Sequence, residues 1–570
     1  MSSRSSHWFR GSSKSNIVHR SWMLGQGIPP DRLDGRPVIG ICNTWSELTP
    51  CNAHLRELAE FVKRGVFEAG GLPVEFPVTS LGESNMRPSA MLYRNLVSMD
   101  VESTINANPI DGVVLLAGCD KTTPALLMGA ASADLPTLVV SAGPMLVGTY
   151  GGSRVGSGTD LYRMSEEIRA GTRSYKDLDA AAGATNRTVG TCNSMGTAST
   201  MACLVEAMGL ALPGNGTIPA VDARRRVLAQ NSGVEIVGLV KRGVKLSDLL
   251  TLGSLHNAIR VSSAIGGSTN AVIHLQAVAG RLDIPLRLED WDRLSRGVPN
   301  IVDLLPSGQG LMDDFFAAGG LQPVLKSLVL AGLIDGDLPT LTGRTLFEAC
   351  ELSDRVNEGV IRTLLDPVAR EGGVAVLRGN LAPDGALLKL SAASPIFNKH
   401  RGRAIVFDGI DDYYRRIDED GLDVTPSSVL VLRNCGPRGY PGMPEVANIG
   451  LPRKILAMGI RDMVRISDAR MSGTAYGTVI LHVSPEAAIG GPLGMVRDGD
   501  VVELDVELRE LRLAVDEPIL SARMLEWRKP HSSVSGYEGL FVEHVMQAHE
   551  GCDFPFLRGK RSAGLPAQYL

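Results

Sequence analysis

Short apolar segments alternate with helix-like segments over about the first quarter of the chain. Four segments with the character of buried strands occupy 37–42 (PVIGIC), 73–79 (PVEFPVT), 112–117 (GVVLLA) and 136–141 (PTLVVS). Helices are predicted between them, at 52–69, 88–107 and 123–132. This alternation is typical of a parallel sheet flanked by helices. Ligands of such sheets bind at the carboxyl ends of the strands, so the loops that follow these strands are the first candidates for a functional site.

A second domain is predicted after a helical middle region. Further helices are expected at 195–211, 222–232, 255–282, 311–332 and 343–366. From residue 371 onward, segments with the two-residue alternation of strands dominate, at 374–377, 404–407, 428–432 and 501–508. The sequence therefore predicts an N-terminal α/β domain at 1–370 and a C-terminal β-rich domain at 371–570, either a sandwich or a barrel.

The composition excludes several classes of protein. Hydrophobic residues make up 44% of the 570 residues and the net charge is only −5, so most of the chain is expected to fold. The weak negative charge argues against a nucleic-acid or anionic-membrane surface. The apolar runs are far shorter than a membrane span, and no secretory signal is visible. Eight cysteines are too few for a disulfide scaffold, which favours a reducing cytoplasm.

Three cysteines stand where loops leave the predicted sheet or enter a helix. They are Cys119, directly after the strand at 112–117, Cys51, before the helix at 52–69, and Cys192, before the helix that begins near Met195. A helix N-terminus favours thiolate over thiol, which makes Cys51 and Cys192 candidate metal ligands. None belongs to a CxxC pair, and a cysteine alone is often a small core residue. If the three converge, they suit either an iron–sulfur cluster with one open iron or a zinc ion with an open position.

Acidic residues and a lysine accompany these cysteines. Asp120 and Lys121 follow Cys119 directly, Glu83 follows the second predicted strand, and Glu445 lies in the Pro/Gly-rich loop GYPGMPE. Carboxylate oxygens are the donors that Mg²⁺ prefers. Any one of these acids taken alone is more often part of the solvated surface.

Two further loops are rich in small residues. Ser472 lies in SDARMSG between strand-like segments, in a context unlike the nucleophile elbow of hydrolases. It would act as a base only if a nearby metal lowered its pKa, and an ordinary turn serine is the simpler interpretation. The loop 266–270 (GGSTN) precedes a helix and is a weak candidate for anion binding on backbone N–H groups. No GxGxxG segment follows a strand, which disfavours a nicotinamide enzyme.

Five segments together resemble one enzyme family. The dihydroxy-acid dehydratase / phosphogluconate dehydratase family has segments similar to PCNAHL around Cys51, GCDKTTPA around Cys119, GTCNSMGTAST around Cys192, GYPGMPE around Glu445 and SDARMSG around Ser472. The resemblance spans about residues 30–555. The segment GESNMRPSAMLYRN resembles the sugar-acid dehydratases, especially those of pentonates, more than the branched-chain biosynthetic branch. Where that branch has Asp-Gly, this chain has Leu81-Gly82.

The resemblance implies cofactors, their ligands and an architecture. It implies a [2Fe–2S] cluster on Cys51, Cys119 and Cys192, and three cysteines leave [4Fe–4S] open as an alternative. It implies Mg²⁺ on Glu83, Asp120, Glu445 and a carbamylated Lys121, with Ser472 as the proton acceptor. It also implies an N-terminal α/β domain, a C-terminal β-barrel domain, a site between them, and a homodimer or homotetramer.

The implied activity is the dehydration of a sugar acid, an aldonate such as a pentonate, to a 2-keto-3-deoxy sugar acid and water. Mg²⁺ would stabilise the developing enolate, the open iron would act as a Lewis acid on the C3 hydroxyl, and Ser472 would take the C2 proton. Carbamylation would make Lys121 an anionic ligand but requires a neutral amine, hence a lowered pKa. The alternatives are a dihydroxy-acid dehydratase of valine and isoleucine synthesis, a non-catalytic iron–sulfur carrier or sensor, and a zinc hydrolase.

Overall fold

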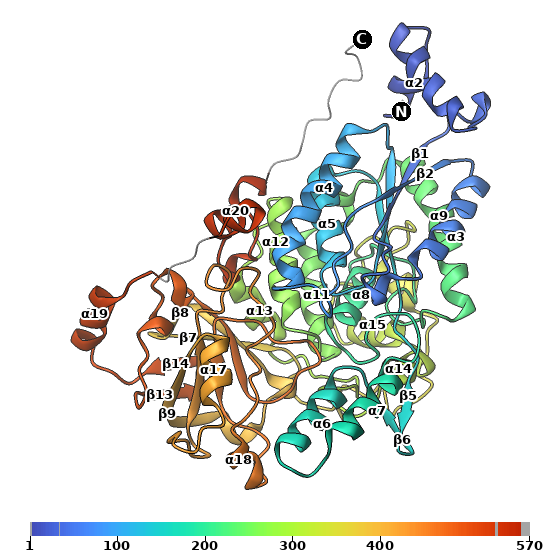
Figure 1. The fold of residues 1–570 in the computed structure, drawn as a ribbon. Helices are drawn as coiled ribbons and strands as arrows, with labels where there is room; N and C mark the ends of the chain where they lie inside the picture. Colours follow the sequence, from blue (N-terminus) through green and yellow to red (C-terminus); the bar gives the residue numbers. More distant parts are fainter. Residues whose placement is uncertain (1–2, 34, 530–533, 560–570) are drawn as a thin grey trace.

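The N-terminal part of the chain is built on a four-stranded parallel sheet (Figure 1). The computed structural model describes residues 3–33, 35–529 and 534–559. The strand order is β2-β1-β3-β4, with bounds Leu72–Pro77, Val38–Asn43, Gly112–Ala117 and Thr137–Ser141. Every residue of β1 and β3 is buried, because helices cover both faces of the sheet. The predicted α/β class is confirmed.

Two pairs of helices cover the sheet. α3 (Leu55–Glu68) packs against α9 (Ala223–Arg242) on one face, and α4 (Arg94–Ala107) packs against α5 (Thr122–Ala133) on the other (Figure 1). The α3–α9 contact depends on glycine. A Cβ atom at Gly65 would lie 1.9 Å from a carbonyl oxygen of α9, so any larger residue there would force the two helices apart.

The helix predicted at 255–282 is in fact two helices. α11 (Leu252–Ala264) ends before the GGSTN loop, and α12 (Asn270–Arg281) begins within it. Gly266 adopts a φ of 62°, a left-handed conformation that glycine tolerates and that turns the chain between the helices. The interruption brings the start of α12 toward the barrel, where it contributes to the site described below.

The prediction of a helix at 343–366 is largely wrong. Only α16 (Leu346–Cys350) forms, because the residues that follow are rich in Asp, Asn and Gly, which favour turns. The segment predicted at 311–332 is divided into α14 (Met312–Ala317) and α15 (Leu321–Leu330) by two glycines with positive φ. Among the described residues, no helix is long and apolar enough to cross a membrane.

The remaining elements of this part lie around the sheet and the central helices. They are α1 (Ser6–Phe9), α2 (Lys14–Gly25), the hairpin β5 (Gly148–Tyr150) and β6 (Ser153–Val155), α6 (Thr159–Arg169), α7 (Tyr175–Thr185), α8 (Thr197–Ala207), α10 (Leu246–Leu249) and α13 (Leu288–Ser295). α2 projects away from the body of the molecule, whereas α6 and α7 lie near the barrel (Figure 1).

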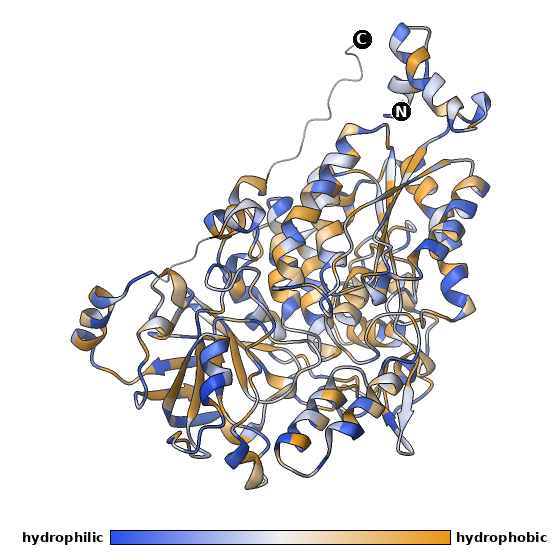
Figure 2. Cartoon of the chain, viewed as in Figure 1, coloured by the Kyte–Doolittle hydropathy of each residue, from blue (hydrophilic) through white to orange (hydrophobic). Residues whose placement is uncertain are grey.

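The second main sheet closes into a barrel in the order β10-β11-β12-β8-β7-β14-β13-β9. In chain order, the strands are Val374–Gly379 (β7), Ala382–Lys389 (β8), Lys399–Asp408 (β9), Val429–Arg433 (β10), Arg465–Ser467 (β11), Val479–Ser484 (β12), Val501–Asp505 (β13) and Glu510–Leu513 (β14). Their buried apolar side chains form a core of their own, and Figure 2 shows these strands as largely hydrophobic. Of the two alternatives left by the strand pattern, the barrel is confirmed. The short helices α17 (Ile410–Arg416), α18 (Arg453–Ala457) and α19 (Glu517–Glu526) accompany it.

The chain returns from the barrel to the helices of the first sheet. α20 (Gly536–His544) and the segment after it pack beside α4 and α12. Arg281 of α12 is fully buried and forms an ion pair with Asp553, with Nε 2.6 Å from Oδ2. Removing one partner of a buried ion pair strongly lowers the stability of the folded protein. This pair therefore holds the last described segment against the N-terminal helices. The boundary at residue 370 remains a prediction, and residues 1–2, 34, 530–533 and 560–570 of the two predicted ranges lie outside the described residues.

A buried lysine in the barrel is expected to make the free energy of unfolding depend on pH. Lys389 is 2% exposed, and its Nζ has no hydrogen-bond partner among the described residues. Burial lowers its pKa from 10.5 to about 7. The folded state therefore binds fewer protons than the unfolded state between these two pH values, so the free energy of unfolding rises with pH across that window and is at its lower level below pH 7.

Replacing Lys389 by methionine is expected to raise the free energy of unfolding near neutral pH by about 3–5 kcal/mol, since one pKa unit corresponds to about 1.4 kcal/mol. The thermal midpoint should rise, and its increase between pH 7 and 10 should become smaller than in the parent protein. Lys176→Met, at an exposed position on α7, is the matched control and should change neither quantity. A midpoint for Lys389→Met below that of the parent at pH 7 would show that the amine has a stabilising partner.

Candidate active site

A cavity of about 630 Å³ lies where loops of the parallel sheet meet loops of the barrel. Seven of the eight residues singled out in the sequence line it: Cys51, Glu83, Cys119, Asp120, Cys192, Glu445 and Ser472. The eighth, Lys121, is fully buried beside it and contacts three of the lining carboxylates. Residues that are up to 421 positions apart in sequence, Cys51 and Ser472, thus face the same space.

The three cysteines reach the cavity from loops: two at the carboxyl ends of the strands and one that precedes α8. Cys51 lies in a 3₁₀ turn (Pro50–Asn52), four residues before α3 begins, and Cys119 follows β3. The two loops are tied together because the backbone N–H of Cys119 donates to Asn52 Oδ1 at 3.0 Å. The approach requires Gly118, since a Cβ there would lie 2.2 Å from the same amide oxygen. The thiols of Cys51 and Cys119 are within hydrogen-bonding reach of each other.

The expectation that helix N-termini hold these thiols as thiolates is wrong for the protein by itself. Burial raises the pKa of Cys192 to about 12, with the charge of Asp120 as the next cause. The contact with Cys119, followed by burial, raises the pKa of Cys51 well above its usual value. α8 begins at Thr197, five residues after Cys192, so the dipole of the helix is too distant to offset burial. The raised pKa favours the thiol form of Cys51 and Cys192, and both would lose their protons on binding a metal.

Lys121 lies among the three carboxylates. Its Nζ is 3.2 Å from Glu445 Oε1, 3.4 Å from Glu83 Oε2 and 3.7 Å from Asp120 Oδ2. Burial and Arg470 lower the lysine pKa, but the three carboxylates together outweigh them, so the pKa is raised overall. Burial alone therefore does not give the lowered lysine pKa that carbamylation requires, and a metal as the cause stays a prediction. The ammonium neutralises the charge that a divalent cation would otherwise neutralise.

Two residues that the sequence analysis did not select complete the acidic cluster. Arg470, in the SDARMSG loop, is fully buried and places Nη1 2.8 Å from Glu445 Oε1 and Nη2 3.6 Å from Glu83 Oε1. Asn270, at the start of α12, donates to the same Glu445 oxygen at 2.9 Å and accepts from Arg470 Nη1 at 3.1 Å. Both residues orient Glu445. Both also lie in segments that the sequence had marked, which was the only signal available for them.

The GGSTN loop does not serve as an anion site in this structure. The N–H groups of Gly266 and Gly267 donate to carbonyl oxygens of α11, and that of Ser268 donates to Thr200 Oγ1. The N–H of Asn270 donates to Ser268 Oγ. These donors are already used within the protein, and the function of the loop is to place the Asn270 side chain beside Glu445.

Ser472 reaches the cavity from the loop between β11 and β12. Its Oγ is 2.9 Å from Thr474 Oγ1, and the Thr474 N–H donates to it at 3.3 Å. The Tyr162 hydroxyl is also within hydrogen-bonding reach. The loop can approach α8 only because residue 473 is glycine: a Cβ at Gly473 would lie 2.5 Å from the N atom of Thr197. The barrel thus places a serine hydroxyl, with donors around it, opposite Cys192 and Asp120.

The donor set fits the implied metal centres on one condition. Three thiols and three carboxylates face one cavity, and the buried Glu83 Oε2 contacts Lys121 Nζ only at 3.4 Å, longer than a normal hydrogen bond. In the described part of the chain, no group of three or more His, Cys, Asp or Glu side chains is arranged to hold a metal ion as it stands. Among the three carboxylates, the Lys121 ammonium lies where they converge. A divalent cation fits the cluster if Lys121 loses its positive charge.

Two models of one protein family match this chain, and together they span most of its length. The N-terminal part of the dihydroxy-acid/6-phosphogluconate dehydratase family matches residues 36–349, and the C-terminal part matches residues 359–552. The chain belongs to this family. The resemblance that the five segments indicated is thereby confirmed.

Curated relatives align with this chain over nearly its full length. It is 57% identical to "L-arabonate dehydratase" of Azospirillum brasilense over 99% of this chain and 98% of the relative. It is 44% identical to "6-deoxy-6-sulfo-D-gluconate dehydratase" of Pseudomonas putida, over 99% and 98%. It is 41% identical to "Dihydroxy-acid dehydratase" of Clostridium novyi, over 90% and 93%. The kinship with sugar-acid dehydratases predicted from GESNMRPSAMLYRN is thus confirmed.

Proposed function

We propose that this enzyme removes water from an aldonate, specifically a pentonate, and produces a 2-keto-3-deoxy sugar acid. The observation that carries the proposal is the convergence of three thiols, three carboxylates and one serine hydroxyl on a single cavity. A dehydratase needs an acid for the departing hydroxyl and a base for the neighbouring C–H, and this cavity holds candidates for both. The relative named "L-arabonate dehydratase", with 57% identity, supports a pentonate.

Cys51, Cys119 and Cys192 would hold a [2Fe–2S] cluster, with [4Fe–4S] as the alternative for three thiol ligands. Glu83, Asp120, Glu445 and a carbamylated Lys121 would hold Mg²⁺. Carbamylation of the Lys121 amine by CO₂ replaces an ammonium by an anion, so the three carboxylates and the carbamate would carry more negative charge than the adjacent Arg470 neutralises. That excess of negative charge is what a divalent ion requires. When bound, the two metal centres supply Lewis acidity toward the oxygens of the substrate.

Ser472 would take the proton from C2. Its Oγ must carry negative charge to do so, and the Thr474 N–H, the Thr474 hydroxyl and the Tyr162 hydroxyl lie where they can donate hydrogen bonds to that charge. Loss of the C2 proton and of the C3 hydroxyl forms one water and an enol, and the enol tautomerises to the 2-keto acid. The overall reaction transfers no electrons to or from the enzyme.

Arg470 and Asn270 would act as positioning residues. Both hold the Oε1 atom of Glu445, so the carboxylate cannot rotate away from Glu83 and Asp120. A ligand held in one rotamer loses less entropy on binding a metal than a mobile one does.

A panel of substrates tests the proposal against the dihydroxy-acid dehydratase of branched-chain synthesis. Anaerobically purified enzyme should form keto acid from L-arabonate or another pentonate, with a much lower kcat/KM for 2,3-dihydroxyisovalerate. Exclusive use of 2,3-dihydroxyisovalerate would reverse the assignment. Strong visible absorbance of the purified protein would exclude a zinc hydrolase, and turnover itself would exclude a carrier or sensor.

The setting of the enzyme is part of the same proposal. The substrate is a small sugar acid, the compartment is the cytoplasm, and the active form is a homodimer or homotetramer. We place the boundary between the α/β domain and the barrel domain at residue 370. Size-exclusion chromatography with light scattering tests the oligomeric state, and a monomer at working concentration would contradict it.

A further inference from the structure

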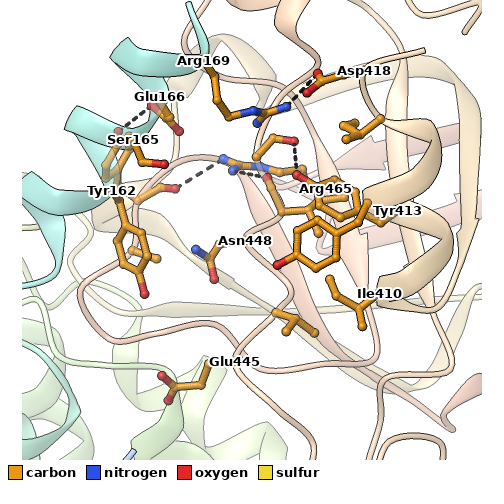
Figure 3. A pocket seen from close by; sticks show the side chains of 17 residues that line it. Tyr162, Ser165, Glu166, Arg169, Ile410, Tyr413, Asp418, Glu445, Asn448 and Arg465 are labelled. Atoms are coloured by element: carbon orange, nitrogen blue, oxygen red, sulfur yellow. Dashed lines mark hydrogen bonds and ion pairs between the residues drawn. The ribbon is translucent and has the colours of Figure 1, made fainter. Parts of the chain in front are cut away.

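A second chamber adjoins the candidate active-site cavity. It measures about 380 Å³ and is built from α6, α17, the loop at 445–450 and residues flanking the Ser472 loop (Figure 3). The two cavities share five lining residues: Tyr162, Ile410, Tyr414, Glu445 and Val446. Because Glu445 and Tyr162 form part of both walls, the second chamber lies directly beside the space that Ser472 faces.

The second chamber contains polar groups that lack protein partners. Figure 3 shows Asn448 between Tyr162 and Tyr413, well inside the chamber. Its Oδ1 atom is buried and has no hydrogen-bond partner among the described residues. The Nε atom of Arg465, a residue that is only 3% exposed, is also buried and has no hydrogen-bond partner among the described residues. A buried acceptor and a buried donor in one polar chamber match a ligand whose hydroxyls both donate and accept.

The charges of the chamber favour an uncharged ligand end. Arg169 is 2.9 Å from Asp418, and Arg465 is 3.0 Å from Asp462, so both guanidinium groups are already neutralised. Glu166 adds a carboxylate, which accepts a hydrogen bond from the Tyr476 hydroxyl at 2.7 Å. A phosphate or sulfonate would meet no cation here that is free of an acid.

The first cavity has the complementary property. Arg87 lines it, and its Nη1 donates only to backbone carbonyl oxygens of Ser84 and Met86. No carboxylate pairs with this guanidinium within the described residues. The anionic end of a substrate is therefore expected at Arg87, and the opposite end at Asn448.

We propose that the second chamber receives the far, uncharged hydroxyl-bearing end of the sugar acid, beyond C3, and that Asn448 is a specificity-determining residue there. The inference rests on the proposed function and adds the orientation of the substrate and the class of end group that is accepted. An end group that carries hydroxyls satisfies the Asn448 amide, whereas an apolar end leaves it unpaired, and this is how buried polar groups reject analogues.

The test compares a long ligand with a short one. Binding of a pentonate and of glycerate, the three-carbon 2,3-dihydroxy acid, is measured by calorimetry on metal-loaded Ser472→Ala enzyme, which does not consume either. Adding Asn448→Ala should weaken pentonate binding by about 10- to 100-fold, whereas glycerate, which lacks C4 and C5, should lose less than about threefold. Asn398→Ala, at an exposed asparagine outside the chamber, is the matched control and should change neither affinity.

Each outcome is decisive. Equal losses for both ligands, or no loss for the pentonate, would overturn the proposal. A pentonate with a terminal phosphate that binds more tightly than the plain pentonate would overturn the preference for an uncharged end. Failure of the unmodified enzyme to dehydrate any pentonate would instead refute the proposed function, which the substrate panel reports separately.

Discussion

Ser472→Ala is expected to lower kcat for pentonate dehydration by about 10²- to 10⁴-fold, the range typical of a lost general base. The substitution removes one hydroxyl from a cavity wall and leaves the three thiols and three carboxylates in place. Iron and magnesium content, visible absorbance and thermal midpoint should therefore match those of the parent, while keto-acid formation falls. The split between intact cofactors and lost turnover separates an enzyme from an iron–sulfur carrier.

The control for this experiment is a serine elsewhere in the barrel domain. Ser427→Ala changes an exposed serine before β10 and should leave kcat unchanged. Near-normal turnover of Ser472→Ala would assign the proton transfer to another group, and Tyr162 would be the next candidate because it shares the same hydrogen-bonding region.

Cys119→Ser is expected to abolish both visible absorbance and activity. Cys119 lies directly after β3 and is 4% exposed, within reach of the Cys51 thiol, so its loss leaves at most two thiols for a cluster. A hydroxyl is a poor substitute because iron–sulfur clusters are held by thiolates. Iron content after anaerobic purification and the absorbance of the protein measure the first effect, and keto-acid formation measures the second.

Cys350→Ser is the matched control for the cysteine experiment. Cys350 ends α16, is buried, and does not line the cavity. Its variant should keep iron and activity, with some loss of stability. A Cys119→Ser protein that retained full iron and turnover would contradict the proposed ligand set, whereas loss of iron in both variants would point to general instability.

Local sequence patterns predicted the elements that depend on local physics. The strand at 112–117 was predicted with the same bounds as β3, because six consecutive apolar or glycine residues between two turns leave few alternatives. Apolar periodicity over 255–282 predicted one helix although GGSTN is recognisable as a loop, because the periodicity continues on both sides of Gly266. The helix expected at 343–366 shows the reverse error, in which weak periodicity outweighed turn-forming residues.

The candidate site was predictable as a set of residues but not as an electrostatic environment. The motifs that surround Cys119 and Ser472 were visible in the sequence, and both residues line the cavity. The pKa of Lys121 was not predictable, because it depends on Glu83 and Glu445, which approach only after folding. The same holds for Arg470: nothing in its immediate sequence shows that its guanidinium would contact carboxylates from two distant loops.

The acidic cluster draws its members from both halves of the protein, since Glu83 and Asp120 come from loops of the parallel sheet and Glu445 from a loop of the barrel. An ion bound by all three carboxylates would link the loops of the parallel sheet to the loop of the barrel. By mass action, such an ion stabilises the state in which the two parts are in contact over the state in which they are apart. Metal binding and the contact between the two parts therefore reinforce each other. Removal of the metal by a chelator should therefore abolish activity and also make the loops between the parallel sheet and the barrel more susceptible to proteolysis.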